Sequence, residues 1–401
     1  MQFKEVIGQE PVKQHLVDMV HSNRLSHALL FLSKEGAGGL PMALAFAQYL
    51  VCEKVQRSGA DTGPSLFGDA APVETLIPAD SCGVCSGCLK AAQMVHPDIH
   101  FSFPTIAKKD SSSTSIVCND WIVEYREFVK NMPYGNSFDW LQFLNAENKQ
   151  GNITAAECND IIRKLSVKSF ESGYKVLIMW MPEYLGKEGN KLLKIIEEPP
   201  ANTVYILVAE NENLILQTIL SRTQLIRVPA LEAEDISTAL QQKAGIEATS
   251  ARQIAIMAEG SYREAIQMLN HASEDWLSIL REWLNAILRN GPVAQVKWVE
   301  EVSKLGREKQ KQFLKYCTHL VEFSIRAQSI PGGADNLPEG ERDFANRLNK
   351  IADFSQLDAI VTEFDKAAYH IERNANAKML FHALTIRLAY IIKDKSLILI
   401  G

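Results

Sequence analysis

The chain of 401 residues is long enough for two or three domains with a large core. Its hydrophobic fraction of 46% and charged fraction of 22% are those of an ordinary globular protein. The net charge of −6 argues against nucleic-acid binding over the whole surface, but not against a local basic patch. Since the sequence contains no apolar run of about 18 residues and its first residues do not form a secretory signal, we expect no membrane span and a cytoplasmic location.

Residues 27–50 predict a buried strand, a glycine-rich turn and a helix in direct succession. This is the layout of a phosphate-binding loop, whose pattern is G-x-x-x-x-G-K-[ST]. The glycines let backbone N–H groups surround the phosphates, the lysine neutralises them, and the hydroxyl holds Mg²⁺. Aligned on Gly36 and Gly38, the turn departs from the pattern at three positions: Ser33 replaces the first glycine, Gly39 the lysine and Leu40 the Ser/Thr. The loop frame is therefore present without the groups that bind charged ligands.

The cysteines predict a metal site. Three of the seven lie in one window with C-x-x-C-x-x-C spacing, Cys82, Cys85 and Cys88, and Cys52 lies upstream. Such clustering favours a metal over disulfides in a chain without a signal peptide. Four thiolates suit tetrahedral zinc, so we expect a structural zinc site with Cys52 or His96 as the fourth ligand. Free surface thiols, a redox C-x-x-C pair and an iron–sulfur cluster are the alternatives.

Short apolar runs predict a parallel sheet. They lie at residues 28–32, 176–180, 204–209 and 224–228, and residues 99–104 alternate like a further strand. A T-x-x-E capping box at residues 154–157 predicts the start of one intervening helix. Because strands alternate with helices, the sequence indicates a parallel sheet covered on both faces.

A nucleotide-hydrolysing sheet needs an acidic residue after a later strand, where it holds Mg²⁺ and positions water. Trp180 and Met181 stand at that position, and Glu183 comes a few residues late. The loop and this position both lack the required groups, and the two losses are independent. Together they favour a protein that does not hydrolyse nucleotide.

Past Pro229, helical spacing replaces the strand pattern until the last few residues. We therefore predict an α/β domain at residues 1–228, a small helical domain at 229–272 and an all-helical domain at 273–401. Breaks at Gly245 and before Ser261 separate the helices of the small domain.

Two arginines stand where they could act on a nucleotide. Arg222, between Ser221 and Thr223, could protrude from the domain rim toward a neighbour's γ-phosphate, as an arginine finger does. A salt bridge within the chain is the interpretation that the sequence alone favours. Arg263, in the first turn of a helix, would face a nucleotide across the lid of a ring-type ATPase, but a structural role is about equally well supported.

These residues together resemble the clamp-loader branch of the AAA+ proteins, and most closely the delta-prime family of bacterial DNA polymerase III. The matching stretches run in order over nearly the whole chain: NRLSHALLF (23–31), the glycine turn, CGVCSGCLK followed by HPD, KSFESGYKVLI, LLKIIEEPP (192–200), TILSRT (218–223), GSYREAIQML (260–269) and RNANAKML (373–380). The resemblance implies an AAA+ α/β domain with a P-loop-type parallel sheet, a small helical lid and an all-α C-terminal collar used for oligomerisation.

The resemblance also implies roles for single residues. Motor subunits of the family keep the loop lysine and threonine and the acidic residues that this chain lacks. The family's zinc ligands map to the four clustered cysteines, with a longer stretch, residues 53–81, between the first two than the family has. Its arginine finger maps to Arg222, with Thr223 in place of the usual cysteine. Arg263 takes the place of the arginine of the lid, the second nucleotide sensor.

The implied function is that of a rigid subunit, without ATP hydrolysis of its own, in a five-subunit ring that opens the sliding clamp and loads it on primed DNA. Its partners would be the motor subunits, the delta subunit and the clamp, with weak contacts to the DNA backbone. Two alternatives are an active AAA+ ATPase with a divergent loop and a zinc-dependent DNA-binding protein. The sequence leaves open whether the loop still binds nucleotide, and it assigns no role to residues 105–150.

Overall fold

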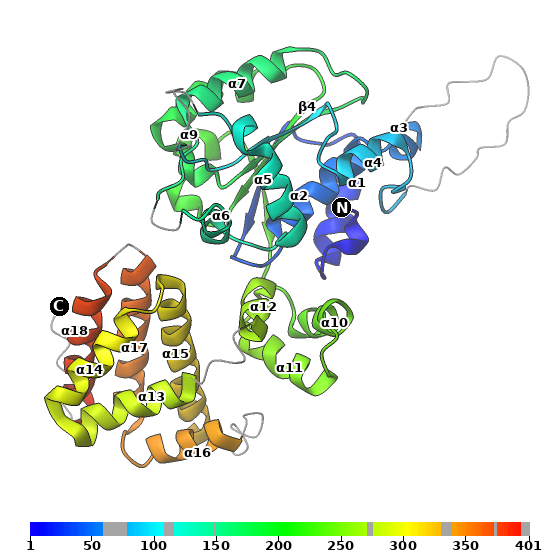
Figure 1. The fold of residues 1–401 in the computed structure, drawn as a ribbon. Coiled ribbons are helices and arrows are strands. Elements are labelled where there is room, and N and C mark those ends of the chain that lie inside the picture. Colours follow the sequence, from blue (N-terminus) through cyan, green and yellow to red (C-terminus); the bar gives the residue numbers. More distant parts are fainter. Residues whose placement is uncertain are drawn as a thin grey trace, which may run out of the picture. The chain divides into compact units, whose positions relative to one another are not determined.

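The computed structural model describes residues 1–58, 78–107, 116–146, 149–270, 276–329, 339–372 and 375–393. The chain divides into two compact units, Met1–Leu269 and Asn270–Gly401 (Figure 1). No helix among the described residues is long and apolar enough to cross a membrane. The small polar residues at 54–74 and 108–114 predict two surface loops; the second loop and most of the first lie outside the described residues.

The beginning of the first of these loops was predicted wrongly. Residues 54–58 belong to a helix, α3 (Glu53–Ser58), and not to an irregular surface loop. Glu53 and Arg57 face each other one helical turn apart and form an ion pair of 3.7 Å, a spacing that stabilises short helices.

The first unit is built on five parallel strands in the order β2-β3-β4-β1-β5. The predicted parallel sheet is therefore confirmed, and the strand that precedes the glycine turn lies inside it, between β4 and β5. The strands are β1 (Ala28–Ser33), β2 (Ile99–Ser102), β3 (Lys175–Trp180), β4 (Thr203–Ala209) and β5 (Gln224–Val228).

Alternate side chains of the strands supply two cores, one on each face of the sheet. Phe31, Ile178 and Val208 point to one core, which contains the helices α1 (Glu10–His21), α2 (Gly39–Leu50), α4 (Ser86–Ala92), α5 (Ile122–Asn131) and α6 (Ser137–Phe143). Leu30 and Leu207 point to the other, which contains α7 (Ala155–Ser166), η3 (Pro182–Leu192), α8 (Leu193–Glu197) and α9 (Gln217–Leu220). Three short 3₁₀ turns are η1 (Phe3–Glu5), η2 (Cys118–Trp121) and η4 (Glu212–Leu214). Both faces are thus covered, as the sequence predicts.

The predicted capping box of α7 is only half formed. The Thr154 hydroxyl accepts a hydrogen bond from the Glu157 N–H at 3.2 Å, so the helix starts where expected. The Glu157 carboxylate does not return the bond, because it accepts one from the Cys118 N–H at 2.7 Å. Burial raises the pKa of Glu157. The residue that should have closed the cap instead anchors the segment before α5.

Three helices complete the first unit. They are α10 (Ala233–Ala244), α11 (Ala248–Met257) and α12 (Tyr262–Asn270), and they share a small core that includes Ile236, Leu240 and Ala251. Gly245 ends α10 with a φ of 67°, a left-handed conformation that favours glycine. We call α10–α12 the lid. The division of the chain at residues 228 and 272 stays a prediction.

The second unit consists of helices around an aromatic core. In chain order they are α13 (Trp276–Asn285), a π-helical turn η5 (Ala286–Asn290), α14 (Gly291–Ser303), α15 (Arg307–Ser329), α16 (Glu339–Leu348), α17 (Phe354–Glu372) and α18 (Ala377–Lys393). Trp283 stacks on Trp298 with ring centroids 4.4 Å apart, and Phe313 and Phe381 pack around the pair.

Candidate functional site

The carboxyl ends of β1, β3 and β4 meet at one edge of the sheet, where ligands of parallel α/β proteins bind. The glycine turn follows β1 there, with Gly36 at a φ of 72° and Gly38 at 101°, so the backbone does follow a tight glycine-dependent path. Helix α2 begins at Gly39, directly after this turn. The local geometry is that of a loop feeding a helix N-terminus.

Other protein groups crowd the space that a side chain at the lysine position would take. A Cβ atom added to Gly39 would lie 2.4 Å from the Ser33 hydroxyl and 3.1 Å from a methyl group of Val208. Ser33, which replaces the first glycine of the pattern, therefore fills the space that a side chain at position 39 needs. The two departures from the phosphate-binding pattern, at positions 33 and 39, are therefore coupled in the structure, because the Ser33 side chain lies where a side chain at position 39 would be.

The pocket that the glycine turn lines is small. It has a volume of about 20 Å³, room for little more than one water molecule. Its lining includes the glycine turn, Leu40, Trp180 and Met181. Leu40 is buried and apolar, and it offers no oxygen to a magnesium ion.

The position that a magnesium-binding acid would take belongs to the hydrophobic core. The Trp180 ring is buried and lies 5.9 Å from the ring of Tyr125 and 5.8 Å from that of Phe128. Met181 is buried too and has a left-handed backbone with a φ of 59°. The late acid, Glu183, is half-buried, and this burial raises its pKa. Its carboxylate accepts the backbone N–H groups of Glu210 and Asn211 at 2.6 and 2.9 Å. It stabilises the turn after β4.

The lid packs directly on the glycine turn. The Tyr262 N–H donates to the Gly36 carbonyl at 3.0 Å, and a Cβ at Gly36 would lie 2.1 Å from the Ser261 hydroxyl. Tyr134, from the segment between α5 and α6, covers the turn from another side, since a Cβ at Gly38 would lie 3.0 Å from its ring. The Tyr134 hydroxyl accepts the Ile7 N–H at 2.8 Å. Side chains of two distant segments thus cover the loop.

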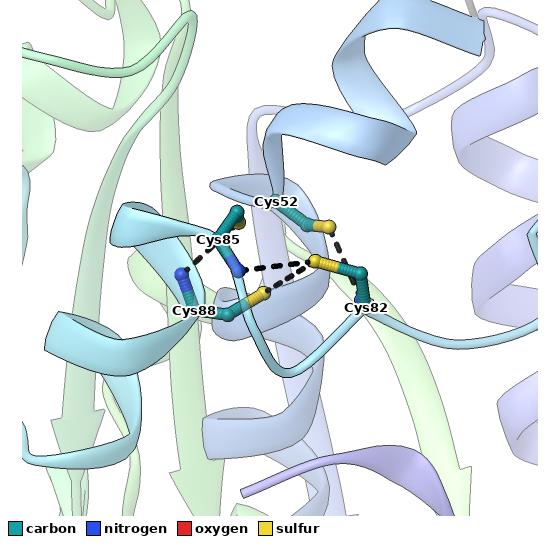
Figure 2. Close-up of side chains that lie close together, drawn as sticks. All are labelled: Cys52, Cys82, Cys85 and Cys88. Carbon is teal, nitrogen blue, oxygen red and sulfur yellow. Dashed lines mark hydrogen bonds between the residues drawn. The ribbon is translucent and has the colours of Figure 1, made fainter.

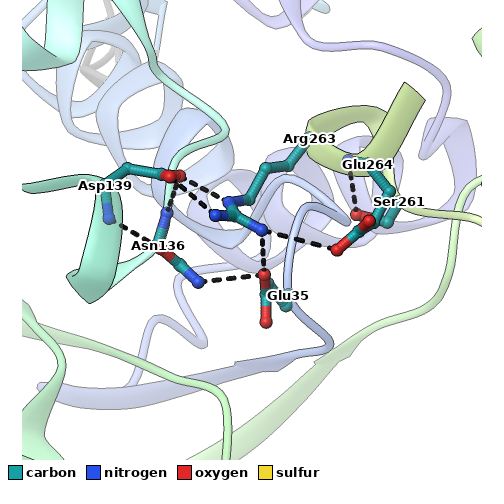
Figure 3. A network of polar contacts seen from close by, with 6 residues as sticks. All are labelled: Glu35, Asn136, Asp139, Ser261, Arg263 and Glu264. Atoms are coloured by element: carbon teal, nitrogen blue, oxygen red, sulfur yellow. Dashed lines mark hydrogen bonds and ion pairs between the residues drawn. The ribbon is translucent and has the colours of Figure 1, made fainter. Parts of the chain in front are cut away.

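Arg263 joins the lid to the α/β domain through a buried ionic network (Figure 3). Its guanidinium forms a fork on Asp139, with Nε–Oδ2 and Nη2–Oδ1 distances of 2.5 and 2.6 Å. Nη1 donates to Glu35 of the glycine turn at 2.6 Å, and Asn136 donates to the same Glu35 oxygen at 2.9 Å. The side chains of Arg263 and Asp139 are 3% and 2% exposed. Hence a carboxylate of the loop itself neutralises the arginine that would otherwise face a phosphate.

Sequence reasoning missed three parts of this network: Glu35, Asn136 and Asp139. Asn136 and Asp139 cap α6 reciprocally. The Asn136 N–H donates to the Asp139 carboxylate at 3.0 Å, and the Asp139 N–H donates to the Asn136 amide oxygen at 2.9 Å. An N-x-x-D spacing before an aromatic segment could have signalled that cap. The sequence carries no signal that Asp139 then receives an arginine 124 positions later.

The four predicted cysteines lie together (Figure 2). Their sulfur atoms are all within 4.8 Å of one another. A tetrahedron with Zn–S bonds of about 2.3 Å has sulfurs about 3.8 Å apart, and the Sγ atoms of Cys82 and Cys88 are 3.8 Å apart. The N–H groups of Cys82, Cys85 and Cys88 donate to the preceding cysteine sulfur at 3.3–3.4 Å, which stabilises negative charge on the cluster. The donor set and spacing fit zinc.

Local electrostatics suit a thiolate at Cys82, whereas burial raises the pKa of Cys52 and of Cys88. Burial opposes the ionisation of Cys82, but the N–H groups of Val84 and Cys85 outweigh it and lower the pKa to about 7. His96, the alternative fourth ligand, is not part of the group of metal-ligating side chains; its Nδ1 accepts the Asp98 N–H at 3.1 Å. The geometry therefore favours Cys52 over His96.

Arg222 lies in the turn between α9 and the edge strand β5, and its side chain is 32% exposed. It forms an ion pair with Glu197 at the end of α8, and its Nη1 donates to the Thr218 carbonyl at 2.8 Å. The hydroxyls of its neighbours Ser221 and Thr223 donate to backbone carbonyls of α9. The salt bridge that the sequence favours is thus present, and the guanidinium remains at the surface.

A family model described as "DNA polymerase III, delta subunit" matches residues 8–232. The chain is 24% identical to DNA polymerase III subunit tau of Bacillus subtilis over 73% of its own length and 41% of that protein's length. It is 25% identical to the delta' subunit of the same organism, over 59% of this chain and 53% of the relative. It is also similar to the structure of a gamma-subunit-related protein of Thermotoga maritima, with 13% identity, a TM-score of 0.35 and coverage of 95% and 99%. The chain thus spans less than half of the tau protein.

Proposed function

The chain belongs to the DNA polymerase III delta-subunit family, and we propose that it serves in a clamp loader as a delta-prime-type subunit that does not hydrolyse ATP. The observation that carries the proposal is the closeness of Ser33 and Val208 to the position that a Cβ atom on Gly39 would take. A lysine at that position would force these neighbours to shift, and the pocket beside it holds about one water. The buried Trp180 and Met181 likewise supply no oxygen to hold Mg²⁺.

The catalytic contribution of this subunit would be Arg222, acting on ATP bound by a neighbouring motor subunit. An arginine finger stabilises the charge that develops on the transferred phosphoryl group. What supports this role is the exposed guanidinium beside a rim strand and the weakness of its only ion pair among the described residues, since exposed pairs are worth roughly 0.2–1 kcal/mol. A phosphate group can therefore reach the guanidinium without a large cost in folding stability.

Zinc would have a structural role in this protein. Bound to Cys52, Cys82, Cys85 and Cys88, the ion would connect the end of α2 to the start of α4. We expect one zinc ion per purified chain by metal analysis, lost in Cys82→Ser and retained in His96→Ala. A zinc-free chain that folds normally would contradict this role.

The further parts of the proposal concern the assembly. The partners would be the motor subunits and the delta subunit in a ring, the sliding clamp, and primed DNA through weak backbone contacts, all in the cytoplasm. Residues 229–272 would form the lid domain and 273–401 the collar that joins the ring.

The test is the ATPase rate of the loader reconstituted with wild-type chain and with Arg222→Ala. The isolated chain should neither bind nor hydrolyse ATP, and the variant should lower clamp- and DNA-stimulated hydrolysis by roughly 10- to 1000-fold. Hydrolysis by the purified chain alone would favour the active ATPase with a divergent loop. Tight, weakly salt-dependent DNA binding by the chain alone would favour the zinc-dependent DNA-binding protein. Unchanged turnover in the complex would remove the finger from the proposal.

A further inference from the structure

We propose that Glu197 is a positioning residue for Arg222: it holds the guanidinium in the orientation from which the arginine acts on the neighbour's ATP. This inference rests on the proposed arginine finger and adds a second residue to it. It is carried by the contacts of the guanidinium with α8 and α9.

The contacts hold the guanidinium along two of its edges. Nε and Nη2 both donate to the same Glu197 oxygen, the former at 2.6 Å. Nη1 donates to the Thr218 carbonyl at 2.8 Å and to the Ser221 hydroxyl at 3.2 Å. Glu197 is the last residue of α8 and Thr218 lies in α9, so the side chain is fixed between the ends of two helices.

The number of donors decides what remains for a ligand. A guanidinium has five N–H groups. The contacts described above use the single N–H of Nε, one N–H of Nη2 and both N–H groups of Nη1. The second N–H of Nη2 is left for an oxygen outside the chain. The Ser221 contact is the longest of the four, and its release would free a second donor, on Nη1. Two adjacent donors are what bidentate recognition of a phosphate needs.

Glu197 is exposed to a degree that excludes a large role in folding. Its side chain is 47% exposed, and pairs of this kind contribute little to stability. What the pair does supply is order, because an unrestrained arginine side chain loses considerable rotamer freedom when it must meet a transition state. Glu197 reduces that loss before the neighbouring subunit binds.

The test is a set of variants in the reconstituted loader with ATP, clamp and primed DNA. Glu197→Ala should lower the kcat of hydrolysis roughly 3- to 10-fold and leave the KM for ATP nearly unchanged, because misplacement of a group used only in the transition state acts on kcat. Glu197→Gln should restore at least half of the wild-type rate, since its amide oxygen still accepts from Nε. The matched control is Glu198→Ala, which removes a charge from the next residue, an exposed glutamate without an ion pair to Arg222 in the described structure.

The double variant Glu197→Ala/Arg222→Ala separates positioning from any other role. If Glu197 acts through Arg222, the double variant should be no slower than Arg222→Ala, so the two effects are not additive. Additive losses, a wild-type rate in Glu197→Ala, or a faster rate because Glu197 competes with phosphate would each overturn the inference. An Arg222→Ala variant with wild-type turnover would overturn the proposed finger itself, so the two failures are distinguishable.

Discussion

Arg263 and Arg222 show two opposite uses of the same side chain. Arg263 is 3% exposed and forms a two-point fork on a carboxylate that is 2% exposed, and it contacts a second carboxylate in the glycine turn. Arg222 is 32% exposed and its carboxylate partner 47% exposed. Burial makes the first pair costly to break, while solvent makes the second contribute little to stability. Position in the fold, and not residue type, separates an arginine that closes a site from one that can serve another subunit.

The largest effect on stability should come from Arg263→Ala. It would leave the buried Asp139 carboxylate without its partner, and breaking one side of a buried pair typically costs 3–5 kcal/mol. We expect the free energy of unfolding of the first unit to fall by about that amount, measured by urea denaturation. Backbone amides of the glycine turn and of α12 should lose protection in hydrogen exchange, because the lid is released.

Arg263→Lys is the control for that experiment. Lysine keeps the positive charge but cannot form the fork on Asp139. The free energy of unfolding of this variant should therefore lie between those of the wild type and of the alanine variant. A change below about 1 kcal/mol in Arg263→Ala would show that the network contributes as little as a surface pair, and the contrast between the two arginines would fail.

Gly39→Lys, the substitution that restores the lysine of the phosphate-binding pattern, should have an effect of intermediate size on stability. Its Cβ would lie 2.4 Å from the Ser33 hydroxyl, so overpacking should destabilise the first unit by about 1–3 kcal/mol without creating ATP binding. The double variant Ser33→Gly/Gly39→Lys removes the closest contact and should regain part of that loss. The measurement is urea denaturation together with calorimetric titration of Mg-ATP. Tight ATP binding by the single variant would contradict a closed loop.

The strands and the turn could be predicted from sequence because their signals are local. Apolar runs such as 176–180 and 204–209 became central strands, and Gly36 and Gly38 mark a turn that glycine alone makes easily. The cysteine spacing predicted a cluster for the same reason. The residues that make up each of these patterns lie close together in the chain, so the patterns can be recognised in a single sequence.

The closure of the site could not be predicted, because it depends on contacts between distant segments. Tyr134 and Asp139 lie within residues 105–150, to which the sequence assigns no role. Tyr134 contacts the glycine turn, and Asp139 contacts Arg263, only in the folded unit. The reason for Gly39 was hidden in part, since one of the two neighbours that crowd a side chain there, Val208, comes from β4. Such pairings follow from strand order, which a single sequence does not encode locally.

The smallest effect on stability should come from Arg222→Ala and Glu197→Ala. Each should change the free energy of unfolding by less than about 0.5 kcal/mol, and that difference should vanish near 1 M salt, because exposed charges are screened. The loss in Arg263→Ala should persist at the same salt concentration, since water and ions do not reach a pair that is 2–3% exposed. Urea denaturation at low and high salt measures both. A loss above about 2 kcal/mol in Arg222→Ala would mean that the fold itself needs the rim arginine. The effect of the variant on a neighbour's turnover would then have to be read as a folding defect.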